Sequence, residues 1–174
     1  MRKIVFVGVL VCGLALSLGA QDTPKAEVFG GYQFVHSNIE GTGVNFNGWD
    51  ASVTGNVNKW FGVTGDFSGS YKSENGASLD VYTYSGGPVL SMSHEGTVNP
   101  FVHVLFGGAH ISASATGLGS AGSNGYTIMA GGGADIKLSP RFAWRGQADW
   151  VYYHFEGVGE SKNVRVATGL VVRF

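Results

Sequence analysis

The chain has 174 residues, one cysteine, and a formal net charge of −1 from eleven basic and twelve acidic residues. This length corresponds to one domain, and the balanced charge excludes the basic stripe that nucleic-acid-binding proteins need. A single cysteine excludes a disulfide framework. Glycine is frequent, with 29 residues, and proline is rare, with 4. The mean hydropathy is positive, at +0.10, without one long apolar segment, which many short strands with one apolar face would explain.

The first twenty residues have the layout of a secretory signal peptide. Arg2 and Lys3 precede an apolar run over residues 4–18, and small residues lead to an exit at Ala20. This order of basic head, apolar core and small-residue exit is typical of a cleaved signal. The run is too short for a comfortable transmembrane helix, so we expect cleavage near Ala20.

Cleavage would leave one domain. We expect residues 1–20 to be the signal peptide, 21–26 a short periplasmic lead, and 27–174 a barrel domain. Removing Arg2 and Lys3 leaves nine basic residues against twelve acidic ones, and it also removes the cysteine. A chain without cysteine suits passage through an oxidising periplasm.

Apolar and polar residues alternate in the first half of the mature chain, as they do in half-buried strands. In the first run, Tyr32 and Phe34 share a face opposite Gln33. In the third run, Phe67 lies opposite Asp66. The first four predicted strands cover residues 27–36, 46–57, 61–71 and 79–92.

The second half continues the pattern. The fifth run is apolar on both faces, and the sixth contains Gly131–Gly133, which we interpret as close packing or a bend. The seventh run sets Trp144 and Trp150 against Arg145, and the eighth ends on Phe174. The last four predicted strands cover residues 101–112, 126–137, 142–154 and 163–174.

The connections differ in length on the two sides of the predicted sheet. Residues 56–59 and 138–141 are tight turns, whereas 37–45, 112–125 and 156–163 are longer and rich in glycine, serine or asparagine. Outer-membrane barrels combine short periplasmic turns with long extracellular loops. Residues 93–99 and 73–78 depart from this pattern. An even number of strands places both termini in the periplasm.

The apolar row of each strand is predicted to face lipid. Aromatic residues lie near strand ends on this row, as in an interfacial belt: Trp49, Trp60, Phe61, Tyr71, Phe142, Trp144, Tyr152 and Phe174. The sequence thus predicts an all-β, eight-stranded antiparallel up-and-down transmembrane barrel. A soluble lipocalin-type barrel would reverse the faces, so Trp49, Phe67 and Trp150 enclosed inside, with Asp66 and Arg145 outside, would indicate a secreted carrier.

The opposite row carries charges in mid-strand. We predict a lumenal network around Arg145, because Asp149 lies four residues further along the same row and Asp135 lies on the preceding strand. The predicted network comprises Asp66, Asp135, Arg145 and Asp149. The alternative is that these side chains simply face interior water.

Two segments carry a family resemblance. The fragment GGGADIKLSPRFAWRGQADW (Gly131–Trp150) and the ending NVRVATGLVVRF (Asn163–Phe174) resemble the small eight-stranded outer-membrane barrels of the OmpA and opacity type. In the C-terminal assembly signal of that family, Gly169, Val172 and Phe174 match, whereas Ala167 replaces the usual polar residue.

The resemblance implies a path of biogenesis and a cellular location. We expect periplasmic chaperones to carry the chain, the barrel-assembly machinery to insert it, and lipid of the outer membrane of a diderm, Gram-negative-type bacterium to surround it.

Signals for cofactors and metals are weak. Residues 117–122 match the dinucleotide motif GxGxxG but lie in a Gly/Ser-rich stretch with a strand after it, where the motif needs a helix. The five histidines are scattered singly, without the spacing of a metal site. We therefore predict no cofactor-binding, metal or nucleic-acid-binding residues.

One pair resembles a catalytic motif. His110 and Ser112 would share a face, as a base and a nucleophile should. The pair is similar to the His-x-Ser of outer-membrane lipid A deacylases, although Ala113 stands where that family has asparagine, and the orienting acid would be Glu156 or Glu160. We assign no catalytic residue.

The sequence favours a non-enzymatic outer-membrane barrel that acts through its extracellular loops, as a structural or surface-interaction protein, with residues 112–125 as the longest loop. The alternatives are a lipid A-modifying barrel enzyme, a narrow solute pore and a secreted ligand-binding barrel.

Overall fold

The computed structural model describes residues 24–174 except 40–41, 75–76, 93–95, 116–118 and 156–158. The predicted signal peptide and residues 21–23 of the predicted lead lie outside the described residues. No helix among the described residues is long and apolar enough to cross a membrane.

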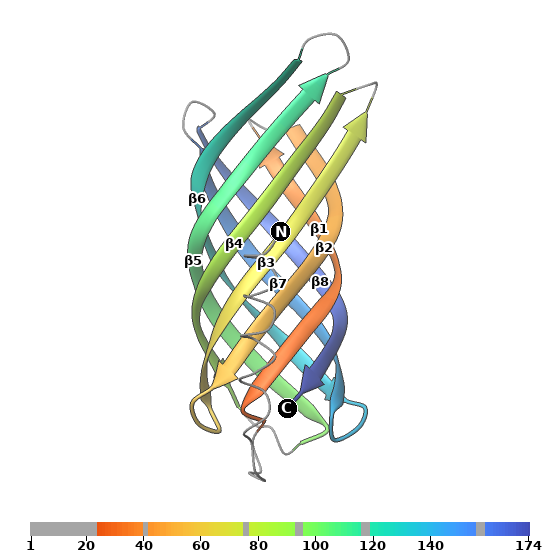
Figure 1. Cartoon of the computed structure of the whole chain (residues 1–174), viewed down its shortest axis with the longest axis vertical. Helices are drawn as coiled ribbons and strands as arrows, with labels where there is room; N and C mark the ends of the chain where they lie inside the picture. The colour runs from red at the N-terminus through yellow and green to blue at the C-terminus, as the bar shows by residue number, and fades with distance from the viewer. Residues whose placement is uncertain (1–23, 40–41, 75–76, 93–95, 116–118, 156–158) are drawn as a thin grey trace, which may run out of the picture.

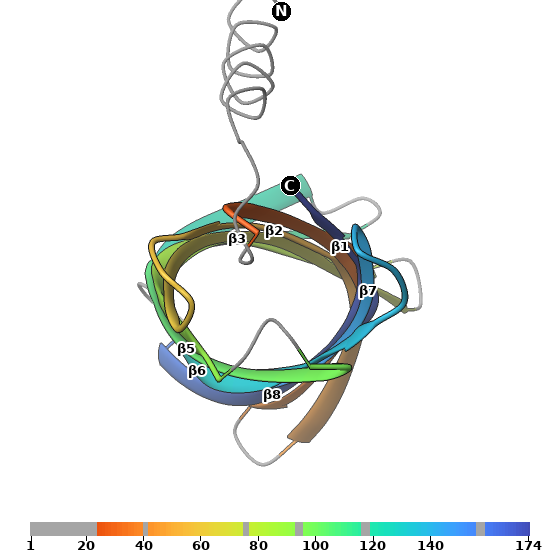
Figure 2. The same ribbon diagram turned by 90° about the horizontal axis from the view of Figure 1, so that it is seen from below.

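Eight antiparallel strands form a closed barrel (Figures 1 and 2). Each strand pairs with its neighbours in sequence, and β8 pairs with β1 to close the ring. This confirms the predicted fold class. The strands are β1 Ala26–Ile39, β2 Thr42–Asn56, β3 Phe61–Glu74, β4 Ala77–Ser91, β5 Val98–Ala115, β6 Gly119–Lys137, β7 Phe142–Phe155 and β8 Gly159–Arg173.

The predicted long loops are mostly strand, so that expectation was wrong. Of residues 112–125, those up to Ala115 belong to β5 and those from Gly119 belong to β6, in a register that pairs Ala115 with Gly119. The predicted loops 37–45 and 156–163 likewise continue β1, β2 and β8. Their glycine and serine content suggested loops, but cross-strand pairing outweighs the low intrinsic strand preference of these residues.

The two faces of the wall have the predicted orientation. Trp49, Phe67 and Trp150 are 42%, 53% and 45% exposed on the outside, whereas Asp66 and Arg145 are 2% and 6% exposed inside. An apolar exterior around a charged interior is the arrangement that a hydrocarbon environment requires. The orientation expected for a secreted carrier is therefore contradicted.

The backbones of β1 and β8, which close the barrel, approach each other closely at one pair of glycines. Gly31 lies opposite Gly169, and a Cβ atom on either residue would be 2.2 Å from a backbone oxygen of the other strand. The chain end reinforces the pairing of these two strands, because Lys25 N–H donates to Phe174 O and Phe174 N–H donates to Ala26 O, both at 2.9 Å. The last residue is thus held in the barrel wall and not left to fray.

Candidate functional site

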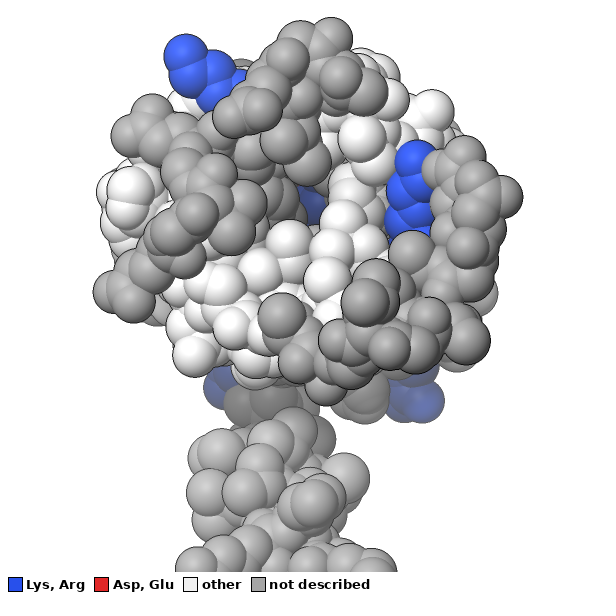
Figure 3. Space-filling view, turned by 90° about the horizontal axis from the view of Figure 1, so that it is seen from above, with Lys and Arg blue, Asp and Glu red and all other residues white. Residues whose placement is uncertain are grey.

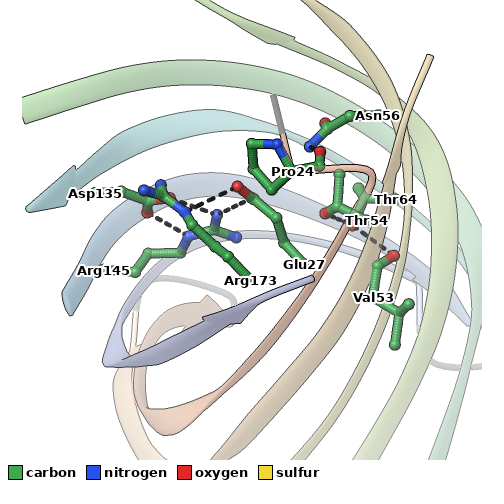
Figure 4. A network of polar contacts seen from close by, with 9 residues as sticks. All are labelled: Pro24, Glu27, Val53, Thr54, Asn56, Thr64, Asp135, Arg145 and Arg173. Atoms are coloured by element: carbon green, nitrogen blue, oxygen red, sulfur yellow. Dashed lines mark hydrogen bonds and ion pairs between the residues drawn. The ribbon is translucent and has the colours of Figure 1, made fainter. Parts of the chain in front are cut away.

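The lumen is the most elaborate part of the described structure, and its first layer lies at the end that holds the start of β1 and the end of β8 (Figure 4). Arg145 Nε donates to Asp135 Oδ1 at 2.7 Å, and Arg145 Nη2 donates to Glu27 Oε2 at 3.2 Å. Arg173 donates to the same two carboxylates, at 3.1 Å to Glu27 Oε1 and 2.9 Å to Asp135 Oδ2. We call these four residues the terminal cluster; it contains two carboxylates and two guanidinium groups.

Arg145 is also enclosed by aromatic rings. Its guanidinium carbon lies 4.5 Å from the ring centroid of Phe101 and 5.5 Å from that of Phe29. A guanidinium over a ring face gains cation–π attraction, which is larger when water is excluded. Ion pairs and rings together therefore compensate the cost of burying this charge.

A second layer surrounds Arg165 in the middle of the barrel. Arg165 Nε donates to Asp149 Oδ2 at 2.8 Å, and its two terminal nitrogens donate to the Asp66 carboxylate at 3.0 and 3.2 Å. Asp50 Oδ2 lies 3.8 Å from Arg165 Nη1, and His103 Nε2 lies 2.8 Å from Asp149 Oδ1. This central cluster holds three carboxylates for one guanidinium group, and the bidentate contact fixes its geometry.

Neutral polar side chains fill the space around the central cluster. Gln147 Nε2 donates to Asp50 Oδ2 at 3.1 Å, and Gln33 Nε2 donates to Ser70 Oγ at 3.0 Å. The Ser68 and Thr83 hydroxyls lie 2.6 Å apart across β3 and β4. These contacts give partners to the amide nitrogens and hydroxyl groups, whereas Gln33 Oε1 and Asp50 Oδ1 are buried without a hydrogen-bond partner among the described residues.

The third layer, toward the opposite end, is apolar. We call it the loop-side cluster; its residues are Val81, Leu105, Ala109, Met129, Val151, Tyr153 and Phe155, with Ile111 packed against it. Leu105, Met129 and Val151 are completely buried. A smaller apolar cluster of Phe29, Ala143, Ala167 and Val171 is buried on the terminal side, where Phe29 contacts Arg145. The charged clusters therefore lie toward the termini and in the middle, and the larger apolar cluster lies toward the hairpin tips.

The four residues of the predicted lumen network fall into two clusters. Asp135 and Arg145 are direct cross-strand partners in the terminal cluster, while Asp66 and Asp149 bind Arg165 in the central cluster. Sequence reasoning left out five residues that complete the clusters: Glu27, Asp50, His103, Arg165 and Arg173. Asp50 and Arg165 carried a usable signal, since both are charged residues on an inward row. The pairing itself depends on distant strands.

The predicted interfacial aromatics all lie on the outer surface or in a turn. Trp60 occupies the turn before β3, and Trp144 faces outward from β7. Trp49 Nε1 donates to Tyr71 OH at 3.0 Å across β2 and β3, and Tyr152 stacks on Trp150. Phe61 lies half-buried beside Trp60, with ring centroids 6.1 Å apart.

The residues of the predicted assembly signal lie at the end of β8 and directly after it. Gly169 makes the close contact with Gly31 described above, Val172 pairs with Phe142 and with Val28, and Phe174 is exposed on the outer face.

The pair His110 and Ser112, which resembles a catalytic motif in sequence, has no catalytic geometry among the described residues. His110 Nδ1 lies 2.7 Å from Asn124 Oδ1, and no hydrogen bond joins His110 to Ser112. Glu156 lies outside the described residues, as do Gly117 and Leu118 of the GxGxxG match. No group of three or more His, Cys, Asp or Glu in the described chain is arranged to hold a metal ion.

Comparisons with known proteins agree with this architecture. No protein-family model and no curated protein matches the chain. Among solved structures, Neisserial surface protein A (NspA) is similar with a TM-score of 0.76 and 12% identity, over 90% of this chain and all of that one. Ail, the attachment invasion locus protein of Yersinia pestis, crystallised with the heparin analogue sucrose octasulfate, is similar with a TM-score of 0.64 and 20% identity, over 86% of this chain and 97% of that one. The outer membrane protein OprG from Pseudomonas aeruginosa is similar with a TM-score of 0.56 and 12% identity, over 87% of this chain and 96% of that one.

The chain therefore has the fold of the small eight-stranded outer-membrane barrels, as its resemblance to the OmpA and opacity type predicts. The apolar exterior agrees with the predicted location in an outer membrane.

Proposed function

We propose that the protein is a non-enzymatic outer-membrane barrel that binds an external macromolecule through its extracellular hairpins. The single observation that carries the proposal is that the β5–β6 hairpin extends beyond the rest of the wall, as an ordered ribbon, at the end opposite the start of β1 (Figure 1). A rigid scaffold that holds a projecting ribbon is suited to recognition.

The ribbon reaches past the described end of β7. Residues Gly119–Asn124 of β6 pair with β5, and the described pairing of β6 with β7 begins at Gly125 opposite Phe155. The outer part of the ribbon is therefore built on the pairing of β5 with β6.

Transport through the lumen is less well supported. The central cluster is buried, with Arg165 only 1% exposed, and Leu105 and Met129 block the loop-side half. Eight-stranded barrels of this kind are filled by their own side chains. We therefore propose an anchor and not a pore.

An enzymatic role is not proposed. The nitrogen of His110 that would be oriented by an acid in a catalytic arrangement contacts an amide instead. The neighbours named above are a surface protein, an attachment protein and an outer membrane protein.

We also propose insertion by the barrel-assembly machinery after transit with periplasmic chaperones. The pattern of Gly169, Val172 and Phe174 at the end of β8 supports this route.

Adhesion of cells that display the barrel tests the function. Cells with the wild-type protein should adhere to plates coated with extracellular matrix proteins at least several-fold better than cells without it. A variant in which a two-residue turn replaces Ala113–Ala121 should lose this difference, and equal shortening of the β7–β8 hairpin should leave it.

The proposal is overturned if the wild type, displayed at an equal level, adheres no better than empty cells. It is also overturned if the shortened β5–β6 variant adheres normally. Steady single-channel currents from the purified wild type in planar bilayers would support the pore instead.

A further inference from the structure

Three histidines lie on the outer surface just above the apolar belt, at the end with the hairpin tips. His36 is exposed, and His110 and His154 are half-buried against the wall. Each continues the outward row of its strand beyond apolar or aromatic residues: Phe34 on β1, Phe106 and Gly108 on β5, and Tyr152 on β7. The apolar part of each row is suited to acyl chains, so we place the polar rings that follow it at the height of the lipid headgroups.

Two of these histidines have the same local geometry. His36 Nδ1 lies 2.7 Å from Asn45 Oδ1 on β2, and His110 Nδ1 lies 2.7 Å from Asn124 Oδ1 on β6. An amide oxygen can only accept a hydrogen bond, so Nδ1 carries a proton in either case. Nε2 is therefore the nitrogen that gains a proton when the ring becomes charged, and the amide contact is kept.

Glycine makes room for both rings. A Cβ atom on Gly43 would lie 3.2 Å from His36 Cε1, and one on Gly122 would lie 3.3 Å from His110 Cε1. The absence of a side chain lets each ring rest along the neighbouring strand. The same His–Asn–Gly arrangement thus occurs in the β1–β2 and β5–β6 hairpins.

The third histidine is held by an aromatic ring and lies near a lysine. His154 stacks on Tyr126 with 4.9 Å between ring centroids. Lys162 on β8 is exposed, and in register it lies opposite Tyr152 on β7 and Asn38 on β1. Lys162 therefore lies between the rows of His154 and His36.

The neighbouring strands set charged and titratable groups beside each histidine, as far as the structure describes the rim. Asn45, Val164 and Lys162 lie around His36; Tyr82, Asp80 and Asn124 lie around His110; Tyr126 and Lys162 lie around His154, which pairs with Glu160 in the backbone register. In the view from this end, Lys and Arg side chains are visible but no Asp or Glu among the coloured atoms (Figure 3).

We propose that His36, His110 and His154, together with Lys162, form a rim that binds the phosphates of anionic lipid headgroups in the surrounding leaflet. A histidine ring that gains a proton as pH falls donates Nε2–H to a phosphate oxygen, as at His36 and His110, whose Nδ1 atoms face amide oxygens. Contact with anionic lipid therefore tightens as pH falls. This rim is independent of the proposed adhesion, because it faces the bilayer and not the exterior.

Quenching of tryptophan fluorescence by brominated lipid tests the rim. The folded protein is placed in phosphatidylcholine vesicles with a minor fraction of brominated phosphatidylglycerol, whose phosphodiester charge is constant over this range. For the wild type, the binding constant of phosphatidylglycerol relative to phosphatidylcholine should rise about threefold between about pH 8 and about pH 5.

Two variants decide the outcome. H36Q/H110Q/H154Q should lose the rise, and H36K/H110K/H154K should bind the anionic lipid tightly at both pH values. K137Q, at the opposite rim, should retain the wild-type rise. A wild type without pH dependence, or a glutamine variant that keeps it, would overturn the proposal. Abolition of the lipid preference by inorganic phosphate would assign the rim to free phosphate and would likewise overturn it.

Discussion

Single buried charges in this barrel depend on the partners that surround them. Arg145 contacts two carboxylates and two aromatic rings, so a neutral apolar replacement leaves Glu27 and Asp135 with one guanidinium group in place of two. An uncompensated buried charge costs more than the intact pair contributes. The contribution of Arg145 is therefore visible mainly when it is removed.

Replacing Arg145 by leucine should lower the free energy of unfolding by about 3–5 kcal/mol. Arg141 is the matched control, because it lies exposed in the turn before β7, and R141L should cost less than about 0.5 kcal/mol. Urea titration of both variants in lipid vesicles measures the difference. Equal and negligible losses would mean that the Arg145 charge is simply hydrated.

At the scale of the strand, β8 combines two requirements in fifteen residues. Its inward row supplies Arg165 and Arg173 to two different clusters, and its outward row carries apolar Leu170 and Val172, with Phe174 directly after the strand. The lumen contacts stabilise the folded barrel. The last residues, as an assembly signal, would instead be bound by the barrel-assembly machinery before folding is complete. Phe174 is thus expected to matter more for assembly than for final stability.

F174A should reduce the fraction of protein that reaches the folded, heat-modifiable form in the outer membrane by several-fold, while unfolding of the protein that does fold should change little. F142A is the control, because Phe142 pairs with Val172 at the same end of the barrel and is similarly exposed, but lies outside the signal. If F142A reduced assembly as much as F174A, both rings would serve only as interfacial anchors.

The whole molecule is organised by its inversion relative to a soluble protein. Outside, bulky apolar side chains are exposed on every strand. Inside, the described residues form two charged clusters and two apolar clusters, of which the loop-side cluster is the larger. Surrounding lipid removes the free-energy cost of exposing apolar side chains to water. Closure of the sheet gives every strand two neighbours with which its backbone N–H and C=O groups form hydrogen bonds. The order of the layers leaves polar groups nearest the termini.

The fluorescence of the four tryptophans can test whether the apolar outer face lies in lipid. Trp49, Trp60, Trp144 and Trp150 are all exposed on the outer wall or its rim, so brominated phosphatidylcholine should quench most of the fluorescence of the folded protein, and aqueous acrylamide should quench little. Unfolded protein in urea should show the opposite order. Strong acrylamide quenching of the folded form would contradict burial of the belt in lipid.

Much of the architecture could be predicted from alternation alone. Trp49 against Asp50 and Phe67 against Asp66 determine two faces, and the charged row cannot face hydrocarbon. These local patterns predicted eight strands, their order and their orientation. They did not predict strand length, because the hairpin ends are built from glycine, serine and asparagine and continue as strands only through pairing with a neighbour.

The partners inside the lumen were decided by tertiary structure. Asp135 and Arg145 are ten residues apart and could be paired from the sequence, but Arg145 and Glu27 are separated by 118 residues and Arg165 and Asp66 by 99. Only closure of the barrel and its register bring such residues to one height. A side chain's face is set by its own strand, since the period is local, whereas its contacts across the lumen depend on the shape of the closed sheet.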